Sequence, residues 1–354
     1  MDSLKKILAF GLIFVMALAG LDLYLQLAEI QSPMETRIDS NIGRTYIPNK
    51  RIIRFDEGFF LGSVNEFGYM GPAVPPRRRN GERRILLFGD SHVLGHTVMP
   101  RHHFGRHLEA YLHKAVGEEI HALNFGKADF SFENMYQIYI DFAGKFDHDL
   151  ALFFISKEDL APSRQFLSGL YPKVRLEGEA LVIDRSFRLS RAYRVYKTLS
   201  PVLTRSAVLR LAFNSLRLTE RNRWMEVVLD KFAALIAPRE DQAAQTLKNL
   251  GKLPTLTRAI LKELAKDPRN ILVSHAAVDP EFLDDIRSTG IPIIDLGVYL
   301  ESLRAEGIDP FYYPATRIRG HWNHATHERI GGFLSQQIIQ RGFGVEGKQK
   351  APSR

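Results

Sequence analysis

The sequence contains no cysteine among its 354 residues. This absence excludes disulfide bonds, thiolate metal sites and a cysteine nucleophile, although it does not identify the compartment. The sequence also lacks a glycine-rich phosphate-binding loop and an internal repeat. Basic residues are scattered along the chain, so we expect no nucleic-acid partner. A hydrophobic content of 45% and a charged content of 25% exclude a disordered or collagen-like chain.

The charge is moderately one-sided. Lysine and arginine together number 48 against 40 acidic residues, which gives a net charge of +8 with histidine neutral. Such an excess favours an acidic partner, for example an anionic glycan or a lipid surface.

The N-terminal segment, residues 1–30, carries an export signal. Lys5 and Lys6 precede an apolar run that extends to residue 28 with one interruption, at Asp22. As a helix, residues 7–28 are about 33 Å long, which is enough to cross a bilayer with Asp22 near the outer interface. Basic residues before the run place the N-terminus inside. We therefore expect the rest of the chain to lie outside the cytoplasm, anchored at the inner membrane.

Two alternatives to an uncleaved anchor remain. Ala17-Leu18-Ala19 fits a small-residue cleavage site, and cleavage after Ala19 would release a secreted protein. The same run could also form a buried helix of a soluble protein.

The remaining pattern predicts an α/β body. Short apolar runs near residues 85–88, 122–125, 150–155, 271–273 and 293–294 alternate with helical stretches such as 104–116 and 132–143. Continuous apolar strands alternating with helices predict a parallel sheet that is covered on both faces.

We expect five regions around this sheet. They are the anchor or signal peptide (1–30), a β-rich extension (31–80), the α/β domain (81–162 and 269–342), a helical insertion (163–268) and a flexible tail (343–354). In the insertion, apolar stripes at helical spacing predict core-facing helices near 225–236 and 260–264.

Candidate chemistry concentrates at the strand ends, because ligands of open parallel sheets bind beyond the carboxyl ends of the strands. Ser91 follows the first strand and opens a helix, so its hydroxyl could act as a nucleophile and its N–H could face an oxyanion. The alternative is an ordinary turn with a serine cap. Gly126 follows the second strand and could offer a second N–H donor. His321, at the start of the last helix, is a candidate general base.

Four segments together resemble the SGNH or GDSL-like hydrolases, in particular their membrane-anchored bacterial members. They are Leu-Phe-Gly-Asp-Ser at 87–91, Leu-Asn-Phe-Gly at 123–126, Gly-His-Trp-Asn at 320–323 and Asn-Glu-Phe-Gly-Tyr at 65–69. The resemblance covers roughly residues 84–162 and 271–340. It implies a three-layer α/β/α fold with a central parallel five-stranded sheet, of flavodoxin-like type.

The same resemblance implies an activity and a set of residues. Ser91 would be the nucleophile and His321 the base, and the backbone N–H groups of Ser91 and Gly126 would form the oxyanion hole. The family cleaves or transfers acyl esters, often acetyl groups on glycans. Positions of the motifs that would bind substrate or are replaced in this chain are Asp90, His92, Asn124, Glu158, Asp159, Arg319 and Asn323.

Two positions depart from the family pattern. Glu158 stands where the family has an oxyanion-binding asparagine, and an ionised carboxylate cannot donate a hydrogen bond. Loss of one oxyanion donor costs about 10²–10³ in rate, although Ser156 or Lys157 could substitute.

The second departure concerns the acid that orients the base. In the family this acid lies two or three residues before the histidine, where this chain has Arg319 and Ile318, and the nearest acids upstream are Asp295 and Asp309. They could reach His321 only through the fold, and a backbone carbonyl could take their place.

Histidines recur at helical spacing, as in the pairs at 92/96 and 103/107 and the series at 321, 324 and 327. Such pairs share one face of a helix and could bind zinc. The His-Glu-x-x-His string is absent, so we expect no metal and no cofactor.

Two functional hypotheses follow. The first is an envelope-anchored serine esterase or O-acetyltransferase that acts on an O-acylated glycan through Ser91 and His321. The second is a non-catalytic module of the same fold that binds polysaccharide or assists an envelope polysaccharide assembly or acylation complex. They differ in whether an acid or a carbonyl orients His321.

Overall fold

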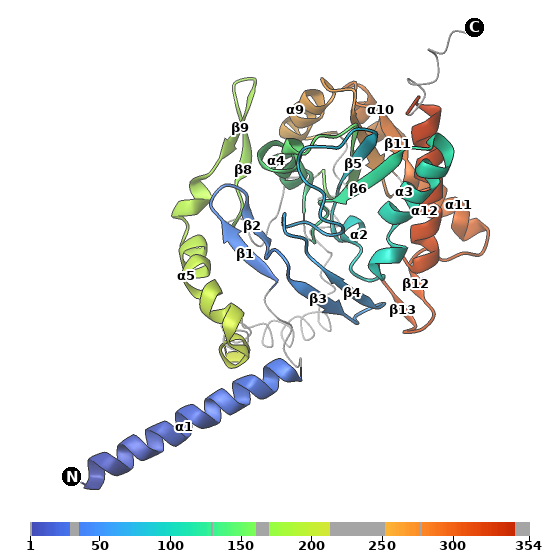
Figure 1. Cartoon of the computed structure of the whole chain (residues 1–354). Coiled ribbons are helices and arrows are strands. Elements are labelled where there is room, and N and C mark those ends of the chain that lie inside the picture. The colour runs from blue at the N-terminus through green and yellow to red at the C-terminus, as the bar shows by residue number, and fades with distance from the viewer. Residues whose placement is uncertain are drawn as a thin grey trace, which may run out of the picture.

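A computed structural model describes residues 2–28, 35–128, 130–160, 170–212, 252–276 and 278–343 (Figure 1). Its centre is a parallel five-stranded sheet in the spatial order β11-β10-β7-β5-β6. The strands are β5 (Glu82–Phe88), β6 (Glu119–Asn124), β7 (Leu150–Ile155), β10 (Asn270–Ser274) and β11 (Ile293–Asp295). Counted along the chain, this is the flavodoxin-like order 2-1-3-4-5. The predicted fold class is confirmed.

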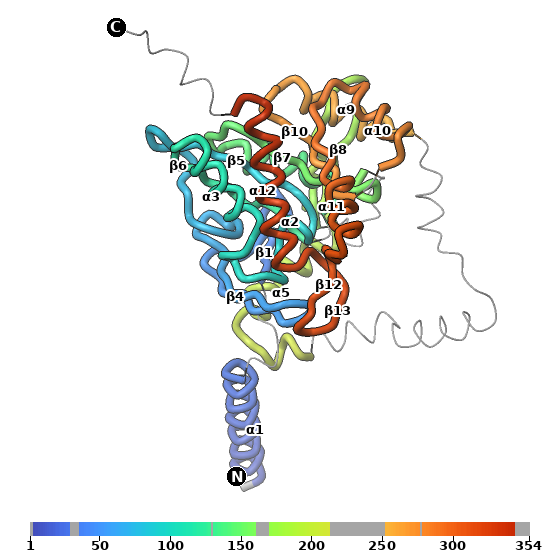
Figure 2. Tube along the Cα trace, turned by 90° about the vertical axis from the view of Figure 1, so that its right-hand side faces the viewer, coloured from blue at the N-terminus to red at the C-terminus, as the bar shows by residue number. Residues whose placement is uncertain are grey.

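Both faces of the sheet are buried, which explains why its strands are continuously apolar. Along β5, Leu86 and Phe88 pack on one face, while Ile85 and Leu87 pack on the other. The first face is covered by α4 (Phe132–Asp141), α9 (Thr255–Leu264) and α10 (Pro280–Arg287). The second is covered by α3 (Phe104–Val116), α11 (Leu296–Ala305) and α12 (His324–Gln340) (Figure 2). The two helical layers and the sheet form the three predicted layers.

The extension before the sheet contains two β-hairpins. Strands β1 (Thr36–Asp39) and β2 (Gly43–Tyr46) form one hairpin, and β3 (Arg51–Arg54) and β4 (Phe60–Ser63) form another. The second hairpin packs through Ile52 and Phe60 against Leu94 of the short helix α2 (Ser91–Leu94). This contact places the loop between β3 and β4 beside the carboxyl end of β5.

The segment between β7 and β10 is more mixed than its sequence suggests. Its described part contains a hairpin of β8 (Lys173–Glu177) and β9 (Ala180–Asp184), which the helical prediction omits, followed by α5 (Arg191–Arg205). Gly178 takes a positive φ of 63° at the turn between the two strands, a conformation that glycine adopts at no steric cost. The predicted helix near 260–264 is present as α9, while the one near 225–236 lies outside the described residues.

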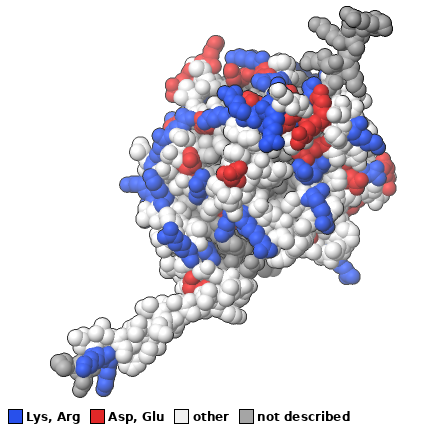
Figure 3. Space-filling view, viewed as in Figure 1, with Lys and Arg blue, Asp and Glu red and all other residues white. Residues whose placement is uncertain are grey.

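Helix α1 (Asp2–Leu27) extends away from the body (Figure 1). Residues 3–27 have a mean hydropathy of 2.2 in their most apolar window and none of that window is buried, so the helix is long and apolar enough to cross a membrane. Figure 3 shows it free of charge along most of its length, with basic side chains at its free tip. Where it meets the body, the Asp22 carboxylate accepts hydrogen bonds from Ser206 Oγ at 2.7 Å and Val208 N at 2.8 Å.

Smaller elements complete the chain. These are the short strands β12 (Tyr312–Tyr313) and β13 (Ile318–Arg319), and the 3₁₀ turns η1 (Pro100–His102), η2 (Ala143–Lys145) and η4 (Ser186–Leu189).

Candidate active site

Ser91 lies at the topological switch point of the sheet. Strand β5 has β6 on one side and β7 on the other, so the chain connections leave it in opposite directions. At its carboxyl end the Asp90 carboxylate caps α2 by accepting a hydrogen bond from the His92 N–H at 2.8 Å. Ser91 is therefore the first residue of α2, and its hydroxyl stands in the crevice where ligands of this topology bind.

His321 lies next to this serine although 230 positions separate them. Its Nε2 is 2.8 Å from Ser91 Oγ. Its Nδ1 is 2.9 Å from both carboxylate oxygens of Glu57. Because a carboxylate can only accept, Nδ1 carries the proton, and Nε2 is left to accept from the serine hydroxyl. The three side chains form a serine–histidine–acid relay with the geometry of a hydrolase triad.

Glu57 comes from the loop between β3 and β4. Its carboxylate also accepts a hydrogen bond from the backbone N–H of His321 at 2.6 Å, so it holds both the ring and the main chain of that residue. Burial alone would raise the pKa of Glu57, but the hydrogen bonds from the backbone N–H and the ring of His321 outweigh it and hold the pKa below its ordinary value. The acid is therefore ionised at neutral pH.

Gly320 makes room for this contact. A Cβ atom at position 320 would collide with the Glu57 carboxyl group. The glycine of the Gly-His-Trp-Asn segment thus allows the Glu57 carboxylate to reach His321.

The acids considered from the sequence have other partners. The Asp309 carboxylate pairs with the Arg319 guanidinium at 2.5 Å. The Asp295 carboxylate caps α11 by accepting from the Val298 N–H at 3.2 Å. The expectation that one of these two acids could orient His321 is therefore wrong. Sequence reasoning missed Glu57 because 264 positions separate it from His321 and nothing in its neighbours distinguishes it from other acids of the extension.

The predicted oxyanion donors have different surroundings. Ser91 N belongs to the first turn of α2, whose N–H groups have no partner within the helix. In contrast, the Gly126 N–H donates to Asn124 Oδ1 at 2.9 Å. As the structure stands, it is not available to an oxyanion, which corrects its predicted role. A Cβ at Gly126 would press on the backbone of α2 at Leu94 N, 2.5 Å away, so this glycine is needed for close packing of that helix.

Ser156 and Lys157, the two possible substitutes for the replaced asparagine, both bind to acids of the protein. The Ser156 hydroxyl donates to Asp159 Oδ2 at 2.8 Å, and the Lys157 ammonium pairs with Asp279 at 2.5 Å. The Glu158 side chain is exposed. The Asp159 carboxylate of the same loop lies 3.7 Å from His275.

Two asparagines of the motifs hold the backbone in place. The Asn124 amide donates to the carbonyl of Leu94 at 3.2 Å and so ties β6 to α2. Asn323 caps α12 by accepting from the Thr326 N–H at 3.0 Å, and it donates to the carbonyls of Asp309 and Tyr312, both at 2.9 Å. These bonds position the segments that carry Ser91 and His321.

Buried histidines surround the relay. The His92 ring centroid is 4.8 Å from that of His321, and the His96 centroid is 6.1 Å away. Burial lowers the pKa of both residues to about 4. They are neutral at pH 7, so they place no positive charge beside the His321 ring.

Other members of the histidine pairs are structural. His103 Nδ1 and His327 Nδ1 accept backbone hydrogen bonds at the start of α3, from Gly105 and Phe104 respectively.

Comparisons with known proteins find remote structural similarity. The chain is similar to a lipase/acylhydrolase from Enterococcus faecalis, with a TM-score of 0.35 and 14% identity over 73% of this chain and 96% of that one. It is also similar to a protein assigned to the lipolytic G-D-S-L family from Desulfitobacterium hafniense DCB-2, with a TM-score of 0.30 and 10% identity over 72% and 98% of the two chains. A gut microbial diltiazem-metabolizing enzyme gives a TM-score of 0.36 and 10% identity over 74% and 48%.

No family model matches the sequence, and no curated protein matches it. Because all three TM-scores are below 0.5, the class of this protein is argued from its own strand order and site residues. Its strand order, the serine after the first sheet strand and the histidine before the last helix are those that the resemblance to SGNH hydrolases implies.

Proposed function

We propose that this protein is a membrane-anchored serine esterase or O-acyltransferase of SGNH type. The observation that carries the proposal is the relay from Glu57 through His321 to the Ser91 hydroxyl, with heavy-atom distances of 2.8 and 2.9 Å. Such a relay activates a serine whose own hydroxyl is a weak nucleophile.

The acylation step follows from the direction of these hydrogen bonds. Ser91 Oγ attacks the ester carbonyl carbon while its proton passes to His321 Nε2. Glu57 stabilises the imidazolium that forms. The tetrahedral intermediate then collapses, the ester C–O bond breaks, and His321 returns the proton to the leaving alkoxide. An acyl-serine and a free alcohol are the products.

The second step decides between hydrolysis and transfer. Water or a sugar hydroxyl gives a proton to His321 Nε2 and attacks the carbonyl carbon of the acyl-serine. The bond from this carbon to Ser91 Oγ then breaks, and His321 returns the proton to Ser91 Oγ, which leaves an acid or a new ester. The +8 charge and the resemblance to glycan-modifying members support an O-acylated, in particular acetylated, glycan as substrate.

The location proposed is the periplasmic face of the inner membrane. Two lysines precede the apolar part of α1 and would retain its N-terminus inside. Asp22 contacts the body at the opposite end of the helix, as an interfacial residue would. The body would then stand on the outer surface, near its polysaccharide substrate.

One observation favours the non-catalytic alternative. Glu158 replaces the expected asparagine, and the Gly126 N–H is engaged with Asn124, so Ser91 N is the one predicted oxyanion donor that keeps its role among the described residues. A module of this kind would bind polysaccharide or assist an acylation complex without turnover.

Covalent labelling distinguishes the two. The full chain in detergent is exposed to a fluorophosphonate, and the adduct is located by mass spectrometry in the wild type, in Ser91→Ala and in the control Ser302→Ala, whose serine is exposed on α11. A single adduct on Ser91, absent from Ser91→Ala alone, is expected. A folded wild-type protein that takes up no label would contradict the enzyme proposal and favour the binding module.

A further inference from the structure

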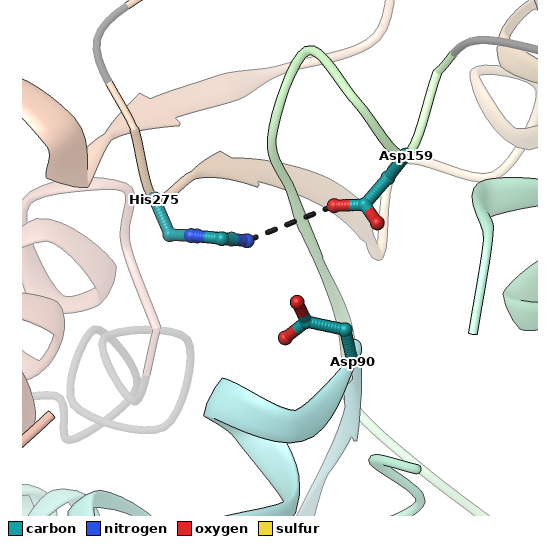
Figure 4. A group of neighbouring side chains, drawn as sticks. All are labelled: Asp90, Asp159 and His275. Atoms are coloured by element: carbon teal, nitrogen blue, oxygen red, sulfur yellow. Dashed lines mark ion pairs between the residues drawn. The ribbon is translucent and has the colours of Figure 1, made fainter. Parts of the chain in front are cut away.

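Three polar side chains meet at the carboxyl ends of three neighbouring strands. Asp90 follows β5, Asp159 follows β7 and His275 follows β10, and these strands are adjacent in the sheet. Figure 4 shows the three side chains pointing towards one another. One ligand atom from each lies within 4.8 Å of the others. None of the three belongs to the Ser91–His321–Glu57 relay.

His275 lacks a hydrogen bond where one is expected. Its side chain is 7% exposed, and its Nε2 has no hydrogen-bond partner within the described part of the chain. Leaving a buried ring nitrogen without a partner is costly. The nitrogen faces the Asp159 carboxylate, its ion-pair partner, whose Oδ2 is 3.7 Å away (Figure 4). An ion between these atoms would give His275 Nε2 the partner that it lacks, beside an Asp159 oxygen that already accepts from Ser156.

The distance between His275 Nε2 and Asp159 Oδ2 matches the distance between two ligand atoms of one metal ion. It exceeds the range of about 2.7–3.2 Å for an N–H···O hydrogen bond. Two ligands that each lie about 2.0–2.2 Å from one ion are separated by about 3–4.4 Å. The 3.7 Å between His275 Nε2 and Asp159 Oδ2 falls within that range. A small closure would bring the whole cluster into it.

The two carboxylates are already oriented by their own loops. Asp90 Oδ1 accepts from the His92 N–H at 2.8 Å, and Asp159 Oδ2 accepts from the Ser156 N–H at 2.7 Å. Hydrogen bonds of this kind hold metal ligands in place and are a regular part of metal sites.

We propose that Asp90, Asp159 and His275 bind one divalent transition-metal ion, Zn²⁺ or Mn²⁺. Two carboxylates balance the charge of the dication, and a buried imidazole nitrogen selects for such ions over Ca²⁺ and Mg²⁺, which prefer oxygen ligands. Three protein ligands leave a further position for water, as in open zinc sites. The proposal does not depend on the esterase function, and it departs from the expectation of no metal drawn from histidine spacing.

The proposed ion would lie close to Ser91. Asp90 directly precedes Ser91, so the cation would lie at the same strand end as the candidate nucleophile. It would offset the negative charge of the two carboxylates there.

Titration of the full chain tests the proposal. The protein in detergent is freed of metal with a chelator and titrated calorimetrically with ZnCl₂ and with MnCl₂. One equivalent of at least one ion is expected to bind. His275→Asn and Asp159→Asn should each weaken that binding at least tenfold. His102→Asn is the matched control, because His102 lies in a separate surface group with His324, at 5.4 Å between ring centroids.

Three results would overturn the proposal. The first is that the wild type binds neither ion. The second is that His275→Asn binds an ion as tightly as the wild type does. The third is that His102→Asn loses the binding instead. Since the buried variants could misfold, X-ray absorption of the wild type with one equivalent of zinc gives an independent answer. A first shell of one imidazole and carboxylate oxygens is expected, and a shell with two or more imidazoles would contradict the proposed set of ligands.

Discussion

The His321 ring is held between a hydroxyl and a carboxylate, so each of its two nitrogens has one role. Nδ1 donates to Glu57 and Nε2 accepts from Ser91. The main-chain N–H of His321 is bound by the same carboxylate, so the acid controls both the tautomer and the position of the ring. The orientation of the ring thus depends on the Glu57 carboxylate, which can accept hydrogen bonds but cannot donate them.

Replacement of the acid by its amide tests this dependence. In Glu57→Gln the amide group can donate to Nδ1 and favour the wrong tautomer. We expect the second-order rate of fluorophosphonate labelling at Ser91 to fall by about 10²–10⁴. The control is Asp56→Asn, which makes the same change one residue away on an exposed side chain. Equal labelling rates in Glu57→Gln and the wild type would show that the carboxylate has no part in activation.

The buried histidines make stability depend on pH. The pKa of His96 is about 4 in the folded protein and 6.5 for a free histidine, because burial disfavours the charged ring. Between these values the unfolded chain binds a proton that the folded protein excludes. The folded state therefore loses stability as the pH falls from about 6.5 towards 4, and this loss is absent above that window.

The corresponding variant should be less sensitive to acid. We expect His96→Gln to reduce the slope of unfolding free energy against pH by up to about 1.4 kcal/mol per pH unit between pH 6 and 4.5. Urea unfolding at several pH values measures the slope. His113→Gln, which removes an exposed histidine on α3, serves as the control. An unchanged slope in His96→Gln would mean that this ring titrates equally in both states.

At the scale of elements, a hairpin outside the sheet supplies part of the site. The loop between β3 and β4 reaches the start of the segment that carries His321, and the hairpin is fixed to the body by the cluster of Ile52, Phe60 and Leu94. Packing of the extension on the α/β domain is thus a condition for the relay, since neither part contains all three groups.

The variant Gly320→Ala should break the contact between Glu57 and the segment that carries His321. The added methyl group would collide with the Glu57 carboxyl group and displace it from the ring. We expect the labelling rate to fall as far as in Glu57→Gln. Because both changes remove the same contact, the double variant should be no slower than either single one. Gly332→Ala on α12, where a Cβ has room, is the control. Additive losses in the double variant would mean that Gly320 acts by another route.

At the scale of the whole molecule, α1 and the body divide two tasks. The helix has an apolar surface with almost no burial, and the body has charges of both signs spread over the face that Figure 3 shows. Asp22 contacts the body where the two meet. The proposed anchored arrangement, with α1 in a membrane and the body in water, rests on this division.

Cell fractionation tests the anchored arrangement. The chain should stay in the membrane fraction after alkaline carbonate extraction, with its N-terminal residues present by mass spectrometry. In spheroplasts, added protease should digest the body and leave a cytoplasmic control protein intact. A mature protein that begins at Gly20 would show cleavage after Ala19 instead, and a protease-resistant body would place it inside.

Local patterns in the sequence were sufficient for the layers of the fold. Runs such as Leu150–Ile155 are apolar at every position, which is possible only for a strand covered on both faces. The periodicity of Phe104, Leu108 and Leu112 likewise predicts α3. These signals are short-range, because burial acts on each residue according to its neighbours along the same element. The sequence did not predict the hairpin of β8 and β9, because apolar and polar residues alternate only weakly along its strands.

The sequence by itself determined the sheet, the helices that cover it, and the positions of Ser91 and His321 at strand and helix ends. Tertiary structure alone decided which acid orients the base, because any carboxylate brought within hydrogen-bond distance can serve and Glu57 is 264 positions away. It also decided that Gly126 donates to Asn124, since the direction of one N–H depends on a neighbouring side chain. The convergence of Asp90, Asp159 and His275 has the same origin: strand order places together residues that the chain holds far apart.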